Sequence, residues 1–214
     1  MLTNRDKAII KDLNKFRVMD RDSIAELHFS NLKNPRYAAN NVLLRLLREG
    51  KIQRSTAFVP YCYFGPDVHM KQNSVKIGHF LAIVNVYKEM KQLGDLHSFL
   101  VEPKYGKKGE GAEPDIYCSF RKTLFFIEVQ KTVYSEKQMN DKLARYVDLY
   151  NSGVVSDNPH VLILSNQRYA IDGDYPFKIF QAESFTQFVN SLRFHQSINT
   201  TLNRETKGIR VVVN

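Results

Sequence analysis

Four polar side chains in the second half of the chain are spaced so that one site can collect them. Asp115 stands at the start of a predicted strand and Glu128 near the end of the next, and a short turn between the strands brings these ends together. Residues 128 and 130 share a strand face because side chains alternate, so Gln130 joins the carboxylates. Lys142, on the helix that follows, is our candidate for a charge-stabilising cation.

Two carboxylates suit a hard, oxygen-preferring ion such as Mg²⁺ or Mn²⁺, which can activate a water for attack on a phosphodiester. We therefore predict Asp115 and Glu128 as metal ligands if the chain is catalytic, with Gln130 orienting a water. Glu102 and Glu89 are weaker candidates for a further ligand. The structural alternative is a strand-edge cap and an ion pair for the two acids and a solvated lysine for Lys142.

The elements that would position these residues alternate between helix and strand. Hydrophobic spacing and turn residues predict an α/β (α+β) fold in this region, with a short strand near 177–180 and a helix near 183–192 extending it. The predicted core order is αβββαβ, with a helix at 75–93, strands at 97–101, 114–119 and 123–129, a helix at 135–151 and a strand at 160–165.

The first part of the chain predicts three short helices and a strand pair. Asn4 can cap a helix ending near residue 16, and the spacing of Ser23 and Glu26 suggests a capping box on a second helix that ends near residue 29. Asn34, Pro35 and Gly50 delimit a third helix, and residues 51–64 are rich in strand-forming residues.

On the third helix, apolar residues share one face and polar residues point elsewhere. We expect the inward face to contain Ala39, Val42, Leu43, Leu46 and Leu47. Asn and Arg side chains can contact base edges in the major groove, and basic side chains can contact phosphate. The predicted DNA-binding residues of the helix and strand pair are Arg36, Tyr37, Asn40, Asn41, Arg45, Arg48, Lys51 and Arg54.

These patterns carry a resemblance to known families. Residues 4–65, and most specifically the segment from Leu46 to Ile52, resemble the winged helix-turn-helix family. Pro114-Asp115 and the strand ending in Glu128 resemble the PD-(D/E)XK nuclease superfamily. The whole is similar to the replication-relaxation family of plasmids and mobile elements, whose pattern matches Pro114-Asp115, Glu128, Lys142 and Tyr146. Gln130 departs from the superfamily, which usually has Lys there.

The resemblance implies two domains, residues 1–65 as a winged helix-turn-helix and 66–214 as a nuclease-like domain. We expect a DNA-binding accessory protein of a plasmid or mobile element, acting in replication or mobilisation or their regulation, with a degenerate or weak nuclease-like domain. One alternative is an active Mg²⁺-dependent DNA endonuclease. Another is a dimeric transcriptional regulator that dimerises through helix 75–93. Double-stranded DNA and a second copy of the chain are the expected partners.

Composition is consistent with these expectations. The chain has 214 residues and a formal net charge of +9, and residues 1–65 hold 12 basic against 6 acidic side chains. Such an excess favours a polyanionic partner, although an anionic membrane surface would suit the charge equally. No apolar run is long enough to cross a bilayer and the start is not a secretory signal, so we expect a cytoplasmic protein without membrane contact.

The two cysteines, one loop and the last residues of the chain give further predictions. Cys62 and Cys118 lie in apolar runs and are expected to be buried thiols, which excludes a disulfide framework and makes a zinc site an unlikely organising feature. The loop 104–111 is expected to be a mobile loop near DNA backbone. Residues 208–213 are β-prone and are expected to add to a sheet edge.

Overall fold

The computed structural model describes residues 1–106, 111–155 and 159–192. The tail segment 208–213 and the centre of the loop 104–111 lie outside the described residues, so the predictions made for them are not addressed. Cys62 and Cys118 are both buried and free, as predicted.

Residues 1–65 form three helices and a small antiparallel sheet. The predicted strand pair is present, and residues just after the first helix add a third strand that the sequence analysis missed. The sheet order is β1-β3-β2, with Gln53 paired to Phe64 across the predicted hairpin. The elements are α1 (Asn4–Phe16), β1 (Val18–Asp20), α2 (Arg21–Phe29), α3 (Pro35–Arg48), β2 (Gln53–Ser55) and β3 (Cys62–Phe64).

The predicted helices are confirmed, but two of their caps are wrong. Thr3, not Asn4, caps α1 and forms a reciprocal capping box with Asp6. Asp20 caps α2 by accepting a hydrogen bond from the backbone N–H of Ser23, which lies inside the helix. A capping side chain must precede the first turn, and each prediction placed the cap too late.

The second half of the chain forms a five-stranded mixed sheet with helices on both faces. Its strand order is β4-β5-β6-β7-β8; the first three strands run antiparallel, and β6, β7 and β8 run parallel. A helical segment at 185–192 follows the last strand. The elements are α4 (Ile77–Leu93), β4 (Leu96–Val101), β5 (Ile116–Phe120), β6 (Thr123–Val129), α5 (Glu136–Asn151), β7 (His160–Leu164) and β8 (Ile179–Ala182).

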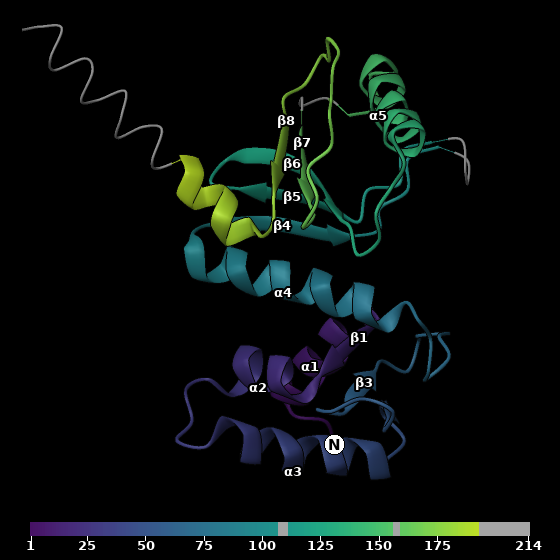
Figure 1. Cartoon of the computed structure of the whole chain (residues 1–214). Coiled ribbons are helices and arrows are strands. Elements are labelled where there is room, and N and C mark those ends of the chain that lie inside the picture. Colours follow the sequence, from purple (N-terminus) through teal and green to yellow (C-terminus); the bar gives the residue numbers. More distant parts are fainter. Residues whose placement is uncertain (107–110, 156–158, 193–214) are drawn as a thin grey trace, which may run out of the picture.

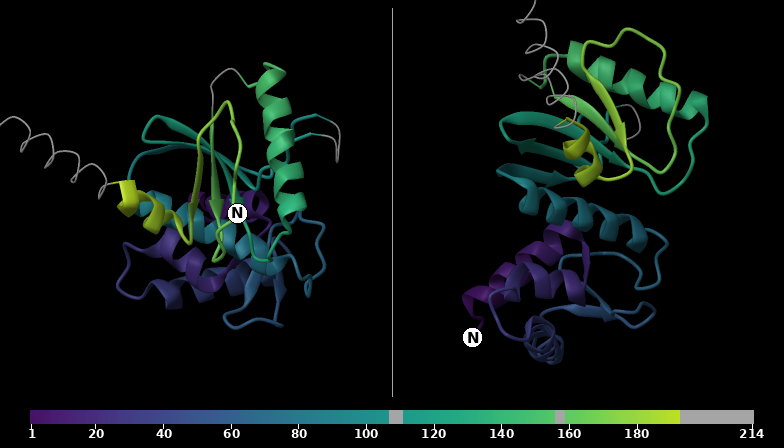
Figure 2. Two further views of the ribbon diagram at one scale, coloured as in Figure 1. Left: turned by 45° about the horizontal axis from the view of Figure 1, so that its top comes forward. Right: turned by 60° about the vertical axis from the view of Figure 1, so that its left-hand side comes forward.

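The α4-β4-β5-β6-α5-β7 order matches the predicted αβββαβ order. One face of the sheet packs on α4 and the segment 185–192, with Ile127 and Phe185 in that core. The other face packs on α5, with Phe126, Met139 and Leu143 in a second core. Alternation along β6 therefore sends successive side chains to opposite helices. Figures 1 and 2 show α4 and α5 on opposite sides of the sheet.

Residues 1–65 form the front unit. Helix α4 lies between this front unit and the five-stranded sheet (Figure 1). Its buried residues include Phe80, Ile83 and Val84, and one continuous hydrophobic cluster runs from α1 through α4 into the sheet. The apolar surface of this helix is therefore used within the chain, whereas the regulator hypothesis assigned it to a dimer interface. No helix among the described residues is long and apolar enough to cross a membrane.

An ion pair between a buried carboxylate and a half-exposed guanidinium joins α1 to α3. The Asp6 side chain is 1% exposed and accepts a hydrogen bond of 2.7 Å from the Arg45 guanidinium. Burial by itself raises the pKa of Asp6, but the hydrogen bonds from Arg45 and Thr3 outweigh burial and lower its pKa. The carboxylate thus caps one helix and orients another.

We expect Asp6→Ala to lower the free energy of unfolding by about 2 kcal/mol, because it removes a cap and leaves the polar groups around it without their partner. Chemical denaturation measures the change. Lys7→Ala, at the exposed neighbouring position, is the matched control and should change stability little. Equal losses for the two variants would show that the Asp6 contacts do not stabilise the packing of α1 and α3.

Candidate functional site

Strands β5 and β6 bring the two predicted acids together. Ile116 pairs with Ile127, so Asp115 and Glu128 lie at the same end of the hairpin. The Oδ2 atom of Asp115 accepts a hydrogen bond of 2.7 Å from the backbone N–H of Val129. Asp115 therefore caps the end of the hairpin next to Glu128.

Glu128 is the centre of the site and is 1% exposed. Its carboxylate forms an ion pair with the Lys142 ammonium and accepts a hydrogen bond from the Tyr146 hydroxyl. Lys142 and Tyr146 are four residues apart on α5, so both side chains leave the same face of that helix. The Lys142 side chain is only 15% exposed, which contradicts the alternative of a solvated lysine.

Asp115, Glu128, Lys142 and Tyr146 form the acidic cluster. Its contacts shift the pKa values of Glu128, Lys142 and Tyr146. Burial raises the pKa of Glu128 to about 7, although the Lys142 charge acts in the opposite direction. Burial alone would lower the pKa of Lys142, but attraction to Glu128 and Asp115 outweighs burial and raises it. Burial and the Glu128 charge together hold the pKa of Tyr146 well above its ordinary value. Tyr146 thus keeps the proton with which it bonds Glu128.

His79 belongs to the site, and sequence reasoning missed it. Its Nε2 atom lies 3.1 Å from Oδ1 of Asp115, and this hydrogen bond raises the pKa of His79. His79 comes from the first turn of α4, far from Asp115 in sequence. Only the packing of α4 on the sheet brings the two together, and no spacing rule in the sequence signals it.

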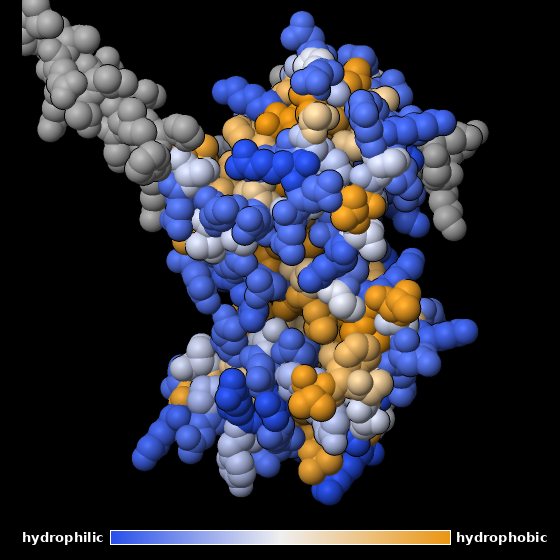
Figure 3. Space-filling model, in the orientation of Figure 1, coloured by the Kyte–Doolittle hydropathy of each residue, from blue (hydrophilic) through white to orange (hydrophobic). Residues whose placement is uncertain are grey.

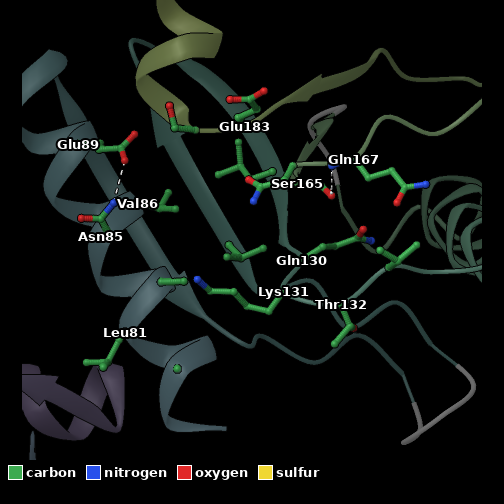
Figure 4. A pocket seen from close by; sticks show the side chains of 17 residues that line it. Leu81, Asn85, Val86, Glu89, Gln130, Lys131, Thr132, Ser165, Gln167 and Glu183 are labelled. Atoms are coloured by element: carbon green, nitrogen blue, oxygen red, sulfur yellow. Dashed lines mark hydrogen bonds between the residues drawn. The ribbon is translucent and has the colours of Figure 1, made fainter. Parts of the chain in front are cut away.

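Gln130 lies just beyond the end of β6. Figure 4 shows its side chain and that of Lys131 extending in opposite directions, as the predicted alternation requires. Both polar atoms of the Gln130 carboxamide are buried and lack a hydrogen-bond partner among the described residues. Its backbone N–H donates to the Leu164 carbonyl, which anchors this residue to β7.

The two weaker ligand candidates have structural partners. Glu102 forms an ion pair of 2.6 Å with Arg17. Glu89 accepts hydrogen bonds from the backbone and hydroxyl groups of Thr186, at 2.8 and 3.0 Å, and from the Asn85 amide. Neither side chain is directed to the Glu128 cluster by these contacts.

The donor set does not fit a divalent ion as it is arranged. Each Glu128 oxygen has a protein partner, and each Asp115 oxygen has one as well. An ion shared by these carboxylates would have to displace the Lys142 ammonium. Within the described ranges, no group of three His, Cys, Asp or Glu side chains is placed to hold a metal.

The second set of predicted site residues lies on α3 and the strand pair. The buried positions of α3 are Ala39, Leu43 and Leu46, as predicted, while Val42 and Leu47 are only half-buried. The Tyr37 side chain is 70% exposed. Among the other candidates, the exposed residues are Arg36, Asn40, Asn41, Arg48 and Lys51.

Three predicted DNA contacts are engaged within the chain. Arg45 binds Asp6 and lies 3.5 Å from Glu49, Arg36 lies 3.3 Å from Asp22, and Arg54 stacks 4.8 Å from the Tyr61 ring centre. Arg45 therefore has a structural role on the inner side of α3. The Arg36 side chain is 72% exposed in spite of its ion pair, so the exposed candidates are Arg36, Tyr37, Asn40, Asn41, Arg48 and Lys51.

Hydrophobic side chains also reach the surface of the front unit. Figure 3 shows a mainly hydrophilic surface with hydrophobic residues gathered at the lower right, where Figure 1 places β3 and one end of α3. Tyr37, Leu44, Val59 and Tyr61 are the exposed large hydrophobic residues of α3 and the hairpin. Apolar side chains beside polar ones suit a surface that contacts sugar or thymine methyl groups.

Comparison of this chain with protein-family models, with curated proteins and with solved structures gives no match.

The raised pKa of Glu128 predicts a pH dependence of stability. Between its ordinary value of 4.5 and about 7, the folded protein binds more protons at this group than the unfolded chain does. Its contribution to stability therefore falls as pH rises through this window. In the wild type, this group should lower the free energy of unfolding by up to about 1.4 kcal/mol per pH unit across the window. We expect Glu128→Gln to remove this dependence, as measured by denaturation at several pH values.

Glu136→Gln, on the exposed first turn of α5, is the control and should leave the slope unchanged. If wild type and Glu128→Gln have parallel stability profiles, Glu128 does not carry a raised pKa.

Proposed function

We propose that this protein is a DNA-binding accessory protein of a plasmid or other mobile element, built from a winged helix-turn-helix and a PD-(D/E)XK nuclease-like domain that has lost or barely keeps cleavage. Its role in replication, mobilisation or their regulation is what the family resemblance implies. The observation that carries the proposal is the outer face of α3, where Tyr37, Asn41 and Arg48 stand exposed beside a two-stranded hairpin.

The front unit supports the DNA-binding part of this proposal. Its inward α3 face is fixed by Ala39, Leu43 and Leu46, so the outward residues are presented on a rigid helix. The Asp6 bond to Arg45 holds the same helix from α1. Amide, guanidinium and phenol groups on one exposed face can combine base-edge and phosphate contacts.

The contacts of the acidic cluster support the part of the proposal that concerns weak or lost cleavage. A catalytic carboxylate must reach the reacting phosphate or an ion that touches it. Glu128 is buried, and its charge is already balanced by Lys142. Tyr146 adds a hydrogen bond, so the cluster ties α5 to β6 much as a structural ion pair would.

We expect the double variant Asn41→Ala, Arg48→Ala to bind duplex DNA about tenfold more weakly than the wild type, because it removes a base-edge donor and a phosphate contact. The salt dependence of binding should also fall, with the slope of log K against log salt reduced by about 1. Fluorescence anisotropy over a salt series measures both quantities.

The matched control is Asn140→Ala, Arg168→Ala, which removes the same residue types from exposed positions on α5 and the β7–β8 connection. This control should bind duplex DNA like the wild type. Equal weakening by the two double variants would mean that charge alone, and not the α3 face, determines binding.

A working DNA endonuclease is a second candidate function, and one observation favours it. Asp115, Glu128, Lys142 and His79 converge at one end of the β5–β6 hairpin from separate parts of the chain. Such convergence of acids and cations is typical of phosphoryl-transfer sites.

Incubation of supercoiled DNA with the protein and Mn²⁺ separates the two functions. Our proposal predicts a mobility shift with little or no nicking, and the same result for Asp115→Asn. Nicking by the wild type that Asp115→Asn and Glu128→Gln both abolish would establish the nuclease instead. Nicking that both variants retain would come from a contaminant or another site.

A further inference from the structure

A polar cavity opens where β6 and β7 end, on the side of the sheet that faces α4. Its volume is about 780 Å³, within the range of small-molecule sites. Lining residues come from α4, from the ends of β6 and β7 and the segments that follow them, and from residues 183–184 just before the segment 185–192 (Figure 4). The carboxyl ends of parallel strands are the usual place for ligands in α/β sheets.

The lining of this cavity combines apolar and polar side chains. Leu81, Val86 and Leu164 are apolar. The carboxamides of Asn166 and Gln167 and several hydroxyl groups are polar, and the Asn85 amide, also in the lining, donates a hydrogen bond to Glu89. A flat ring with apolar faces and hydrogen-bonding edges matches such a surface, and carboxamides are suited to the donor and acceptor pair on a base edge.

Lys131 gives the cavity a cation. Its side chain is exposed and extends from the end of β6 toward α4 (Figure 4). Two acids also line the cavity, Glu89 on α4 and Glu183 just before the segment 185–192. Glu89 already accepts hydrogen bonds from Thr186 and Asn85. A phosphate carried by the ring would meet the Lys131 ammonium, with the Glu89 charge committed elsewhere and Glu183 as the second acid of the lining.

The cavity also borders the acidic cluster. Gln130 lines it just beyond the end of β6, two residues after Glu128, and Gly78 lines it next to His79.

We propose that this cavity holds one unpaired nucleotide of a DNA strand, with its base against the apolar lining residues, its edge at the carboxamides of Asn166 and Gln167 and its phosphate at Lys131. The inference rests on the proposed DNA-binding function and adds a second contact, separate from α3. The same chemistry would accept a free nucleotide, so the test compares the two sources.

Gly78 allows the cavity to be filled without disturbing the fold. A Cβ atom built on Gly78 meets nothing within 4 Å, and its backbone does not require glycine. We expect Gly78→Phe to weaken binding of a short labelled oligodeoxyadenylate by at least about tenfold, as measured by fluorescence anisotropy. Lys131→Ala should weaken it as well. Ala144→Phe, at an exposed position on α5, makes a similar change outside the cavity and should bind like the wild type.

Binding of duplex DNA, of the oligodeoxyadenylate and of dAMP is measured for each variant. Circular dichroism melts show that each variant is folded. Retained duplex binding by Gly78→Phe, together with lost single-strand binding, supports the cavity as a nucleotide site. Wild-type single-strand binding in both Gly78→Phe and Lys131→Ala overturns it and leaves the duplex function intact. Binding of dAMP that Gly78→Phe abolishes, with no binding of the oligonucleotide, overturns the strand assignment in favour of a free nucleotide. Absence of duplex binding by the wild type contradicts the proposed function itself.

Discussion

Helix α4 is apolar on two sides, and the architecture depends on both sides being covered. Phe80, Ile83 and Val84 are buried where the front unit and the sheet meet around this helix. A helix with so wide an apolar surface is stable in water only when it is enclosed. Its position also determines the site, because the first turn of α4 delivers His79 to Asp115. The packing that unites the two halves of the chain therefore also completes the acidic cluster.

The buried carboxylate of Glu128 imposes the second constraint. An isolated buried charge is costly, and the chain meets this cost with a cation and a hydroxyl from one face of α5. The crossover helix between two parallel strands is thereby fixed by a polar contact as well as by Met139 and Leu143. The Glu128 contacts therefore have an effect on folding that does not depend on any catalytic role.

Local patterns in the sequence were sufficient to predict most elements and part of the site. The strands at 123–129 and 160–165 and the helices at 4–16 and 135–151 follow from alternation, helical spacing and turn residues, which act over a few neighbours. The nearness of Asp115, Glu128 and Lys142 followed from a short hairpin and the order of elements. What could not be predicted depends on long-range packing: the third strand β1, the inward turn of Arg45 to Asp6, the contact of His79 and the cavity beside Gln130.

The central claim is that DNA meets this protein at α3 and not at the Glu128 cluster. The most direct test is a titration of duplex DNA into ¹⁵N-labelled protein, followed by the backbone amide signals in NMR spectra. The account predicts that the largest shifts occur at residues 36–48 and along the hairpin at 51–64, with little change at Glu128, Lys142 and Tyr146. Large shifts at these three residues, with α3 unaffected, would contradict the account and assign duplex binding to the acidic cluster.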